Sequence, residues 1–174
     1  MVNDVRQQAT RHIAAMKRYA VALCRDPVRA DDLVQEALAR ALTGIASYRR
    51  EAPMLPWLLR ILHNVYVSDR RRPRGDEAPL HEHEDAVAEN AVAEERVQGS
   101  QLLRLLWTLP EEQRAAVSLI CLDELSYAEA ASVLGIPKGT LMSRLARGRA
   151  ALRALAEAGE AGPRARLRIV GGEQ

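Results

Sequence analysis

The sequence of 174 residues contains no Phe, and aromatic residues make up only 3% of it. Its hydrophobic content of 48% is ordinary for a globular protein, and much of it is Ala and Leu. Alternation of Val or Ile with polar residues, the pattern of a half-buried strand, is hard to find. These absences disfavour a β fold and predict an all-α protein.

Cysteine is rare, and the chain has no long apolar run. Cys24 and Cys121 lie far apart, and no apolar signal region stands at the N-terminus, so we expect two reduced thiols in a cytoplasmic protein rather than a disulfide. No stretch approaches the roughly 18 apolar residues that a membrane span needs. We therefore expect a soluble protein without membrane insertion.

Signatures of catalysis are also missing. There is no Gly-rich phosphate loop, and no Ser, Cys or His stands in a recognisable nucleophile motif. The letters HEHED at residues 81–85 offer side chains that can bind zinc or nickel, but they fall in a segment without a scaffold to fix a metal geometry. We expect no enzyme activity, no catalytic residue, no cofactor and no metal site. A metal-dependent hydrolase is the least favoured interpretation.

Charge is divided along the chain. Residues 1–73 carry 13 Lys and Arg against 7 Asp and Glu, residues 74–100 carry 2 against 8, and residues 101–174 carry 10 against 8. The central stretch is acidic, rich in Ala and poor in large apolar residues, so it buries little surface and is typical of a linker. We predict two small helical domains, residues 1–73 and 101–158, joined by an acidic linker at 74–100 and followed by a tail at 159–174.

Helical periodicity organises the first of these domains. A helix is predicted over about residues 5–23, and Pro27 is expected to stop it. In RADDLVQEALARALTGI, a second helix from about Ala30, the apolar stripe leaves Asp32, Gln35, Glu36 and Arg40 outside. The stretch MLPWLLRILHNVYVSDRRRP predicts a third helix that ends at Pro73.

The segment LSYAEAASVLGIPKGTLMSRL combines several helix-end signals. Ser126 and Glu129 fit a capping box, Gly135 suits the left-handed residue that closes a helix, and Pro137 suits the first turn of the next helix. Two helices joined by a tight turn form a helix-turn-helix.

The second helix of this pair has two contrasting faces. A helical wheel places Leu141, Leu145, Gly148 and Leu152 together, so this face is predicted to be buried. The opposite face carries small residues and Arg147, which can donate two hydrogen bonds to guanine. Flanking arginines at 144, 149 and 153 are placed to meet phosphates. In an isolated helix such arginines would more often be a solvated face, but the preceding turn favours DNA binding.

These motifs carry a resemblance to a known family. GTLMSRLARGRAAL is similar to the recognition helix in region 4 of bacterial sigma factors of the extracytoplasmic-function group of the sigma-70 family. LPEEQRAAVSLICLDELSYAEAASVLGIP resembles the helices before it. DPVRADDLVQEALARAL resembles region 2.2, and YRREAPMLPWLLRILHNVYVSDRRR resembles regions 2.3 and 2.4. The resemblance covers roughly residues 10–155 in the family's order.

The resemblance implies three binding surfaces. Core RNA polymerase would dock on Asp32, Gln35 and Glu36, although a solvated acidic stripe is the alternative without the family match. The minus-35 element would contact Lys138, Thr140, Met142, Ser143, Arg144, Ala146, Arg147 and Arg149. The minus-10 element would contact Tyr48, Arg49, Arg50, Arg60, Asn64, Arg70 and Arg71.

Two aromatic residues of the minus-10 segment allow alternatives. In this family the loop GIASYRRE would catch a base that leaves the stack, and Tyr48 stands where the family has an aromatic residue. Tyr48 could equally pack back on the core, and Trp57 is more often core than a stacking platform. On the following helix, His63 is expected to lie off the apolar face together with Arg60 and Asn64.

The sequence thus predicts a sigma factor that binds core RNA polymerase, recognises minus-35 and minus-10 promoter elements and promotes DNA opening in transcription initiation. Promoter DNA, core polymerase and an anti-sigma factor are the expected partners, and the free protein is expected to be a monomer. A stand-alone helix-turn-helix regulator and a sigma-like decoy that sequesters an anti-sigma factor are the alternatives.

Overall fold

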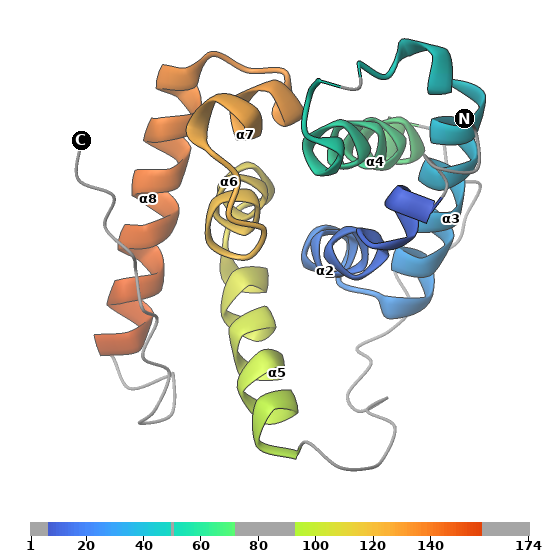
Figure 1. Ribbon diagram of the computed structural model, residues 1–174. Coiled ribbons are helices and arrows are strands. Elements are labelled where there is room, and N and C mark those ends of the chain that lie inside the picture. The colour runs from blue at the N-terminus through green and yellow to red at the C-terminus, as the bar shows by residue number, and fades with distance from the viewer. Residues whose placement is uncertain (1–6, 50, 72–92, 158–174) are drawn as a thin grey trace.

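The computed structural model describes residues 7–49, 51–71 and 93–157, and within these ranges it holds helices and no β-strand. The first domain consists of α2 (Ile13–Cys24), α3 (Pro27–Thr43), the 3-10 helix η1 (Ile45–Ser47) and α4 (Met54–Arg71). The second domain consists of α5 (Ala93–Thr108), α6 (Glu111–Cys121), α7 (Tyr127–Leu134) and α8 (Lys138–Glu157). Figure 1 shows the two groups of helices beside each other, which confirms the predicted all-α fold with two helical domains.

The junction between α2 and α3 depends on two adjacent residues. Arg25 adopts the left-handed conformation, with φ 60°, and closes α2. The Asp26 carboxylate then accepts hydrogen bonds from the backbone N–H groups of Val28 (2.9 Å) and Arg29 (3.3 Å), which caps α3. Pro27 is the first residue of α3 rather than only the stop of the preceding helix, because its fixed φ and missing N–H suit this position.

The helix-turn-helix forms as the local signals predict. The backbone N–H of Glu129 donates to the Ser126 hydroxyl (3.3 Å), and the backbone N–H of Ser126 donates to the Glu129 carboxylate (2.9 Å), which completes the capping box. Gly135 closes α7 with φ 64°, a value at which a side chain would be strained. The next helix, α8, begins at Lys138, directly after Pro137.

The first helix of the second domain is longer than its expected extent. It begins at Ala93, inside the stretch that was predicted to be an acidic linker, whereas the second domain was predicted to begin at residue 101. Ala and Glu are strong helix formers, so the segment AEER at its start extends the helix without needing apolar residues.

The two domains pack against each other and share one hydrophobic core. Helix α2 packs on α6, and α4 packs on α7. Met16 and Leu23 of α2 belong to the same buried cluster as Leu119 of α6 and Ala131 of α7. A smaller cluster, built around Leu106, lies within the second domain. The chain therefore adopts a closed arrangement, by which we mean that α6 and α7 cover one face of the first domain.

Candidate nucleic-acid and polymerase interface

Helix α8 presents the two faces that the helical wheel predicts. Leu141, Leu145, Gly148 and Leu152 are buried, and Met142 on the opposite side is 49% exposed. A Cβ atom added at Gly148 would lie 2.7 Å from Cγ2 of Val117 on α6, so glycine allows the two helices to approach closely. The predicted buried face is confirmed, and it fixes which side of α8 can meet a ligand.

The outer face of α8 is open and carries mostly small or polar residues. Lys138, Ser143, Ala146 and Arg147 are exposed, and Thr140 is half-buried. The Ser143 hydroxyl donates to the Thr140 carbonyl (2.9 Å), and Nε of Arg147 donates to the Ser143 carbonyl (3.3 Å). These bonds hold Arg147 along the helix surface while leaving its terminal nitrogens available for a base edge.

Two of the flanking arginines, Arg144 and Arg149, contact side chains of α6. Arg144 has 19% of its side chain exposed and forms an ion pair with Glu112, at 3.0 Å between Nη2 and Oε2. Nη2 of Arg149 donates to Sγ of Cys121 at 3.8 Å. Both arginines thus brace α8 against α6, whereas Arg153 is exposed.

Helix α4 carries the minus-10 candidates on two sides. Arg60 and Asn64 are exposed and lie one helical turn apart, and Arg71 is also exposed. Arg70 forms an ion pair with Glu111 of the second domain and lies over the Tyr66 ring, 5.9 Å from its centroid. Among the arginines predicted to contact the minus-10 element, Arg70 is therefore already paired with a carboxylate of the second domain in the closed arrangement.

His63 does not lie on an outer face, so that expectation was wrong. Its Nδ1 is hydrogen-bonded to the Tyr19 hydroxyl at 3.0 Å. Burial, together with the positive charge of Arg144, lowers the pKa of His63 to about 4. The second domain supplies that Arg144 charge, which a helical wheel of α4 alone cannot include.

The Tyr48 ring of the predicted base-catching loop packs on Trp57 of α4. The rings of Tyr48 and Trp57 have centroids 4.9 Å apart and an interplanar angle of 40°, and both side chains pack against the core. The Tyr48 hydroxyl donates to the Ala52 carbonyl at 2.8 Å. Of the two alternatives for Tyr48, packing on the core is the one present in this structure. Arg49 is exposed, and Arg50 lies outside the described residues.

The outer face of α3 carries the predicted polymerase-binding residues and two apolar residues that sequence analysis missed. Asp32, Gln35 and Glu36 are exposed, and Glu36 pairs with Arg40 at 2.5 Å. Val28 is 73% and Leu42 39% exposed. At 100° per residue, Val28 and Leu42 fall on the same line of the helix as Asp32 and Gln35, so this face combines polar and apolar contacts. For Val28 the signal was present in the helical wheel, in which it lies away from the buried stripe. Leu42 borders that stripe, and the apolar spacing wrongly predicted it to be part of the core.

Side chains of each domain donate hydrogen bonds to backbone carbonyls of the other domain, in the last turn of α2 and in α5. Nε1 of Trp107 donates to the Val21 carbonyl (3.2 Å), and Nη2 of Arg114 donates to the Leu23 carbonyl (3.1 Å). In the other direction, Arg25 donates to the Trp107 carbonyl. Each of these carbonyls also accepts within the first domain, Val21 from the backbone N–H of Arg25 (3.1 Å) and Leu23 from the Tyr66 hydroxyl (3.4 Å), so the second domain adds a further donor to each. Sequence analysis missed these residues because nothing local distinguishes a charged residue that will be buried.

A second ion pair joins the domains between a half-exposed arginine and a buried carboxylate. Arg18 Nη2 lies 3.1 Å from Oδ1 of Asp123, whose side chain has no exposed surface. Burial raises the pKa of Asp123 to about 6, although the Arg18 charge and hydrogen bond act in the opposite direction. The hydroxyl of Tyr19 lies nearby, and its pKa is raised well above 10.0 by burial and by the charge of Asp123. The carboxylate therefore costs free energy in the closed arrangement.

No cluster of His, Cys, Asp and Glu in the described ranges could hold a metal ion. The HEHED stretch at 81–85 lies outside those ranges. Among the residues that the structure describes, no helix is both long and apolar enough to cross a membrane. Cys24 and Cys121 are both free thiols.

Comparison with known families identifies both domains as parts of a sigma factor. The family described as Sigma-70 region 2 matches residues 9–75, and the family described as Sigma-70, region 4 matches residues 100–152. These matches define the class as sigma-70 transcription initiation factors. The chain belongs to the extracytoplasmic-function (ECF) RNA polymerase sigma factors.

Individual relatives support this membership. The chain is 33% identical over 162 residues to the ECF RNA polymerase sigma factor EcfG of Rhodopseudomonas palustris, covering 89% of this chain and 86% of the relative. It is 36% identical over 143 residues to the ECF RNA polymerase sigma factor SigM of Mycobacterium tuberculosis, covering 82% and 71%. Such relatives are regulatory initiation factors rather than enzymes.

A solved structure resembles the whole fold. The sigma factor RpoE of Bartonella quintana, in complex with the anti-sigma factor NepR, superposes with a TM-score of 0.71 at 25% sequence identity. The match covers 88% of this chain and 97% of that chain, so it includes both domains.

Proposed function

We propose that this ECF sigma factor docks on core RNA polymerase through the outer face of α3, contacts a minus-35 element with the outer face of α8, and opens a minus-10 element with α4 and the loop before it. The observation that carries the proposal is the open face of α8, the second helix of the helix-turn-helix, where Arg147 lies among small residues. Small residues let the helix backbone approach base edges, and arginine pairs with guanine through two hydrogen bonds.

The exposed pair Arg60 and Asn64 supports the minus-10 assignment. Asn can pair with the edge of adenine, and Arg60 can hold a neighbouring phosphate. We propose that Tyr48 leaves its contact with Trp57 when a base enters this region, since a flipped base needs an aromatic or apolar surface to replace its stack. Arg49 and Arg50 would then hold the backbone beside it.

The closed arrangement must open for this function. The minus-35 and minus-10 elements are centred about 25 base pairs apart, which is roughly 85 Å of duplex at about 3.4 Å per base pair. In the closed arrangement Arg144 of α8 lies near enough to His63 of α4 for its charge to lower the pKa of His63. Helices α8 and α4 therefore cannot reach both elements at once until the second domain separates from the first.

We further propose that an anti-sigma factor binds this protein and favours the closed arrangement. Support comes from the resemblance across both domains to a sigma factor bound by its anti-sigma factor. The free protein is proposed to be a monomer that acts in the cytoplasm, as its sigma-factor relatives do.

The minus-35 assignment is tested by replacing Arg147 with Ala. If Arg147 reads a guanine, the variant should lose about 1–3 kcal/mol of discrimination at one base pair of the minus-35 element and keep its affinity for core polymerase. Run-off transcription from a promoter library measures the first quantity, and co-purification measures the second. Arg153→Ala is the matched control, because it removes an exposed arginine from the same helix and should weaken all promoters alike. An equal loss on every promoter in Arg147→Ala contradicts the assignment.

The polymerase assignment is tested by the double variant Gln35→Ala, Glu36→Ala. Both residues are exposed and neither belongs to the hydrophobic core, so the variant should fold normally. It should lose binding to core RNA polymerase. Asn64→Ala is the control on the neighbouring surface, and it should retain core binding while losing promoter opening. Normal co-purification of the double variant with core would show that α3 does not dock there. Core binding of the wild-type chain without run-off product would favour the decoy.

A further inference from the structure

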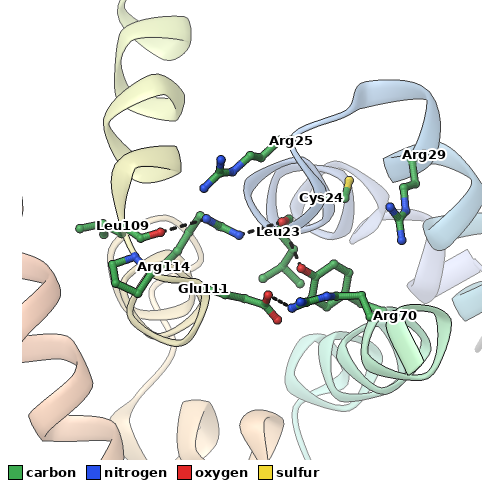
Figure 2. A pocket seen from close by; sticks show the side chains of 10 residues that line it. Leu23, Cys24, Arg25, Arg29, Arg70, Leu109, Glu111 and Arg114 are labelled. Atoms are coloured by element: carbon green, nitrogen blue, oxygen red, sulfur yellow. Dashed lines mark hydrogen bonds and ion pairs between the residues drawn. The ribbon is translucent and has the colours of Figure 1, made fainter. Parts of the chain in front are cut away.

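A cavity lined by four arginines lies between the two domains, where nothing in the proposed function requires one. It has a volume of about 350 Å³ and is bounded by the C-terminal ends of α2 and α4 and by the N-terminal ends of α3 and α6, and Glu111 of α6 is the one carboxylate among its lining residues. Figure 2 shows Arg25, Arg29, Arg70 and Arg114 around it, and Tyr66 also lines its wall. The volume falls at the lower end of the range for small-molecule sites, so it suits a compact ligand.

The charges around this cavity are only partly balanced. Arg70 is paired with Glu111, and Arg29 is paired with Asp69. Arg114 donates to the carbonyls of Leu109 (3.0 Å) and Leu23 (3.1 Å), and Arg25 donates to the carbonyl of Trp107. Within the described ranges, no carboxylate lies within 4.0 Å of Arg25 or Arg114. Two guanidinium charges therefore face the cavity without a counter-charge from those ranges.

Arg114 is the least solvated of the four. It is 4% exposed, and its Nε is buried without a hydrogen-bond partner. Burial lowers the pKa of Arg114, and the nearby charges of Arg25 and Arg70 lower it further. A buried cation next to two others is costly unless an anion shares its environment.

We propose that this cavity binds a compact polyanion with phosphate groups, of the pyrophosphate class, which bridges Arg25 of the first domain and Arg114 of the second. Guanidinium groups bind phosphate through paired hydrogen bonds and carry their charge at every physiological pH. The bridge exists only in the closed arrangement, because separating the domains separates the two arginines. One consequence rests on the proposed function: the ligand stabilises the closed arrangement and thereby opposes binding to core polymerase.

Binding is tested by isothermal titration of the full chain with inorganic pyrophosphate at constant ionic strength. Wild-type protein should bind one equivalent, and Arg25→Gln should bind at least tenfold more weakly. Arg104→Gln removes an exposed arginine of the second domain, so it changes net charge equally and should stay within twofold of wild type. If Arg25→Gln does not fold by circular dichroism, Arg25→Lys takes its place with the same direction of effect, because an ammonium group keeps the charge but lacks the paired donors of a guanidinium. Absence of saturable binding to wild type, or equal weakening in both variants, overturns the proposal.

The source of the phosphate chemistry is distinguished by two further titrations. Inorganic phosphate should bind more weakly than pyrophosphate, because one phosphate cannot span both arginines. Adenosine diphosphate should bind about as tightly as pyrophosphate if the ligand is a nucleotide, and more weakly if the cavity admits only the inorganic anion. Binding of phosphate as tight as that of pyrophosphate would contradict the bridge.

Coupling to function is measured by binding to core polymerase. At a pyrophosphate concentration ten times the dissociation constant, affinity of wild type for core should fall by about tenfold, and that of Arg25→Gln should not change. Saturable pyrophosphate binding with unchanged core affinity would overturn the coupling. A chain that binds pyrophosphate and never binds core would refute the proposed function and leave the cavity assignment standing.

Discussion

Buried Asp123 and partly buried His63, both at the domain interface, should make stability depend on pH in opposite directions. The pKa of His63 is lowered from 6.5 to about 4, so His63 contributes stability that is complete above pH 6.5 and is lost as the pH falls to about 4. The pKa of Asp123 is raised from 3.8 to about 6, so its contribution is complete below pH 3.8 and is lost as the pH rises through 6. In the wild type the two effects largely cancel.

The size of each effect follows from the shifts. One unit of pKa difference corresponds to about 1.4 kcal/mol, so each group is expected to contribute about 3 kcal/mol, and somewhat less for His63, which is only partly buried. His63→Gln removes the first titration and Asp123→Asn removes the second. Relative to wild type, Asp123→Asn should gain about 2 to 3 kcal/mol of unfolding free energy between pH 4 and pH 7. His63→Gln should gain a similar amount as the pH falls over the same range.

Urea unfolding at several pH values measures both differences. Subtracting the wild-type free energy at each pH removes the titration of all other groups, which the variants share. The difference curve of a double variant should be nearly flat, because the two opposite slopes add and largely cancel. Two difference curves that slope in the same direction, or that stay flat, would refute the reasoning. The Asp123→Asn result is the sharper one, because the Asp123 side chain has no exposed surface and burial disfavours its charged form.

Two stability predictions concern the second domain, and both are measured by urea unfolding. Gly148→Ala should cost about 1–3 kcal/mol, because the new Cβ would meet Val117 at 2.7 Å, whereas Gly139→Ala, with nothing within 4 Å, should gain up to about 1 kcal/mol. Equal effects of the two would contradict the close approach. Ser126→Ala should cost about 1 kcal/mol through loss of the capping box, and Ser132→Ala, an exposed position of the same helix, should be nearly neutral. A neutral Ser126→Ala would mean that the cap adds nothing.

Local signals predicted the parts of the fold that depend on a few neighbouring residues. The capping box at Ser126, the left-handed Gly135 and the buried face of α8 all follow from spacing within one or two turns. The exposed positions Arg147 and Asn64 follow in the same way, since a helical wheel separates them from the buried stripe.

The contacts between domains could not be predicted in this way. Arg114 follows three polar residues at the start of α6, and the Leu23 carbonyl that accepts its hydrogen bond lies 91 residues away in sequence. His63 was expected to face outward, since a helical wheel of α4 alone includes neither Tyr19 nor the second domain, and these bury it. Tyr48 had two plausible environments, and only the position of Trp57 distinguishes them. Long-range packing therefore decides which charged and aromatic residues remain free.

The shared core also has a consequence for synthesis of the chain. The first domain is complete once α4 has been made, but α6 and α7, which cover one of its faces, end about 60 residues later. At a translation rate of about 5–20 residues per second, that face would stay uncovered on the ribosome for several seconds. During this interval the carbonyls of Val21 and Leu23 would lack the donors of Trp107 and Arg114, and the apolar surface around Met16 and Leu23 would be open to chaperones.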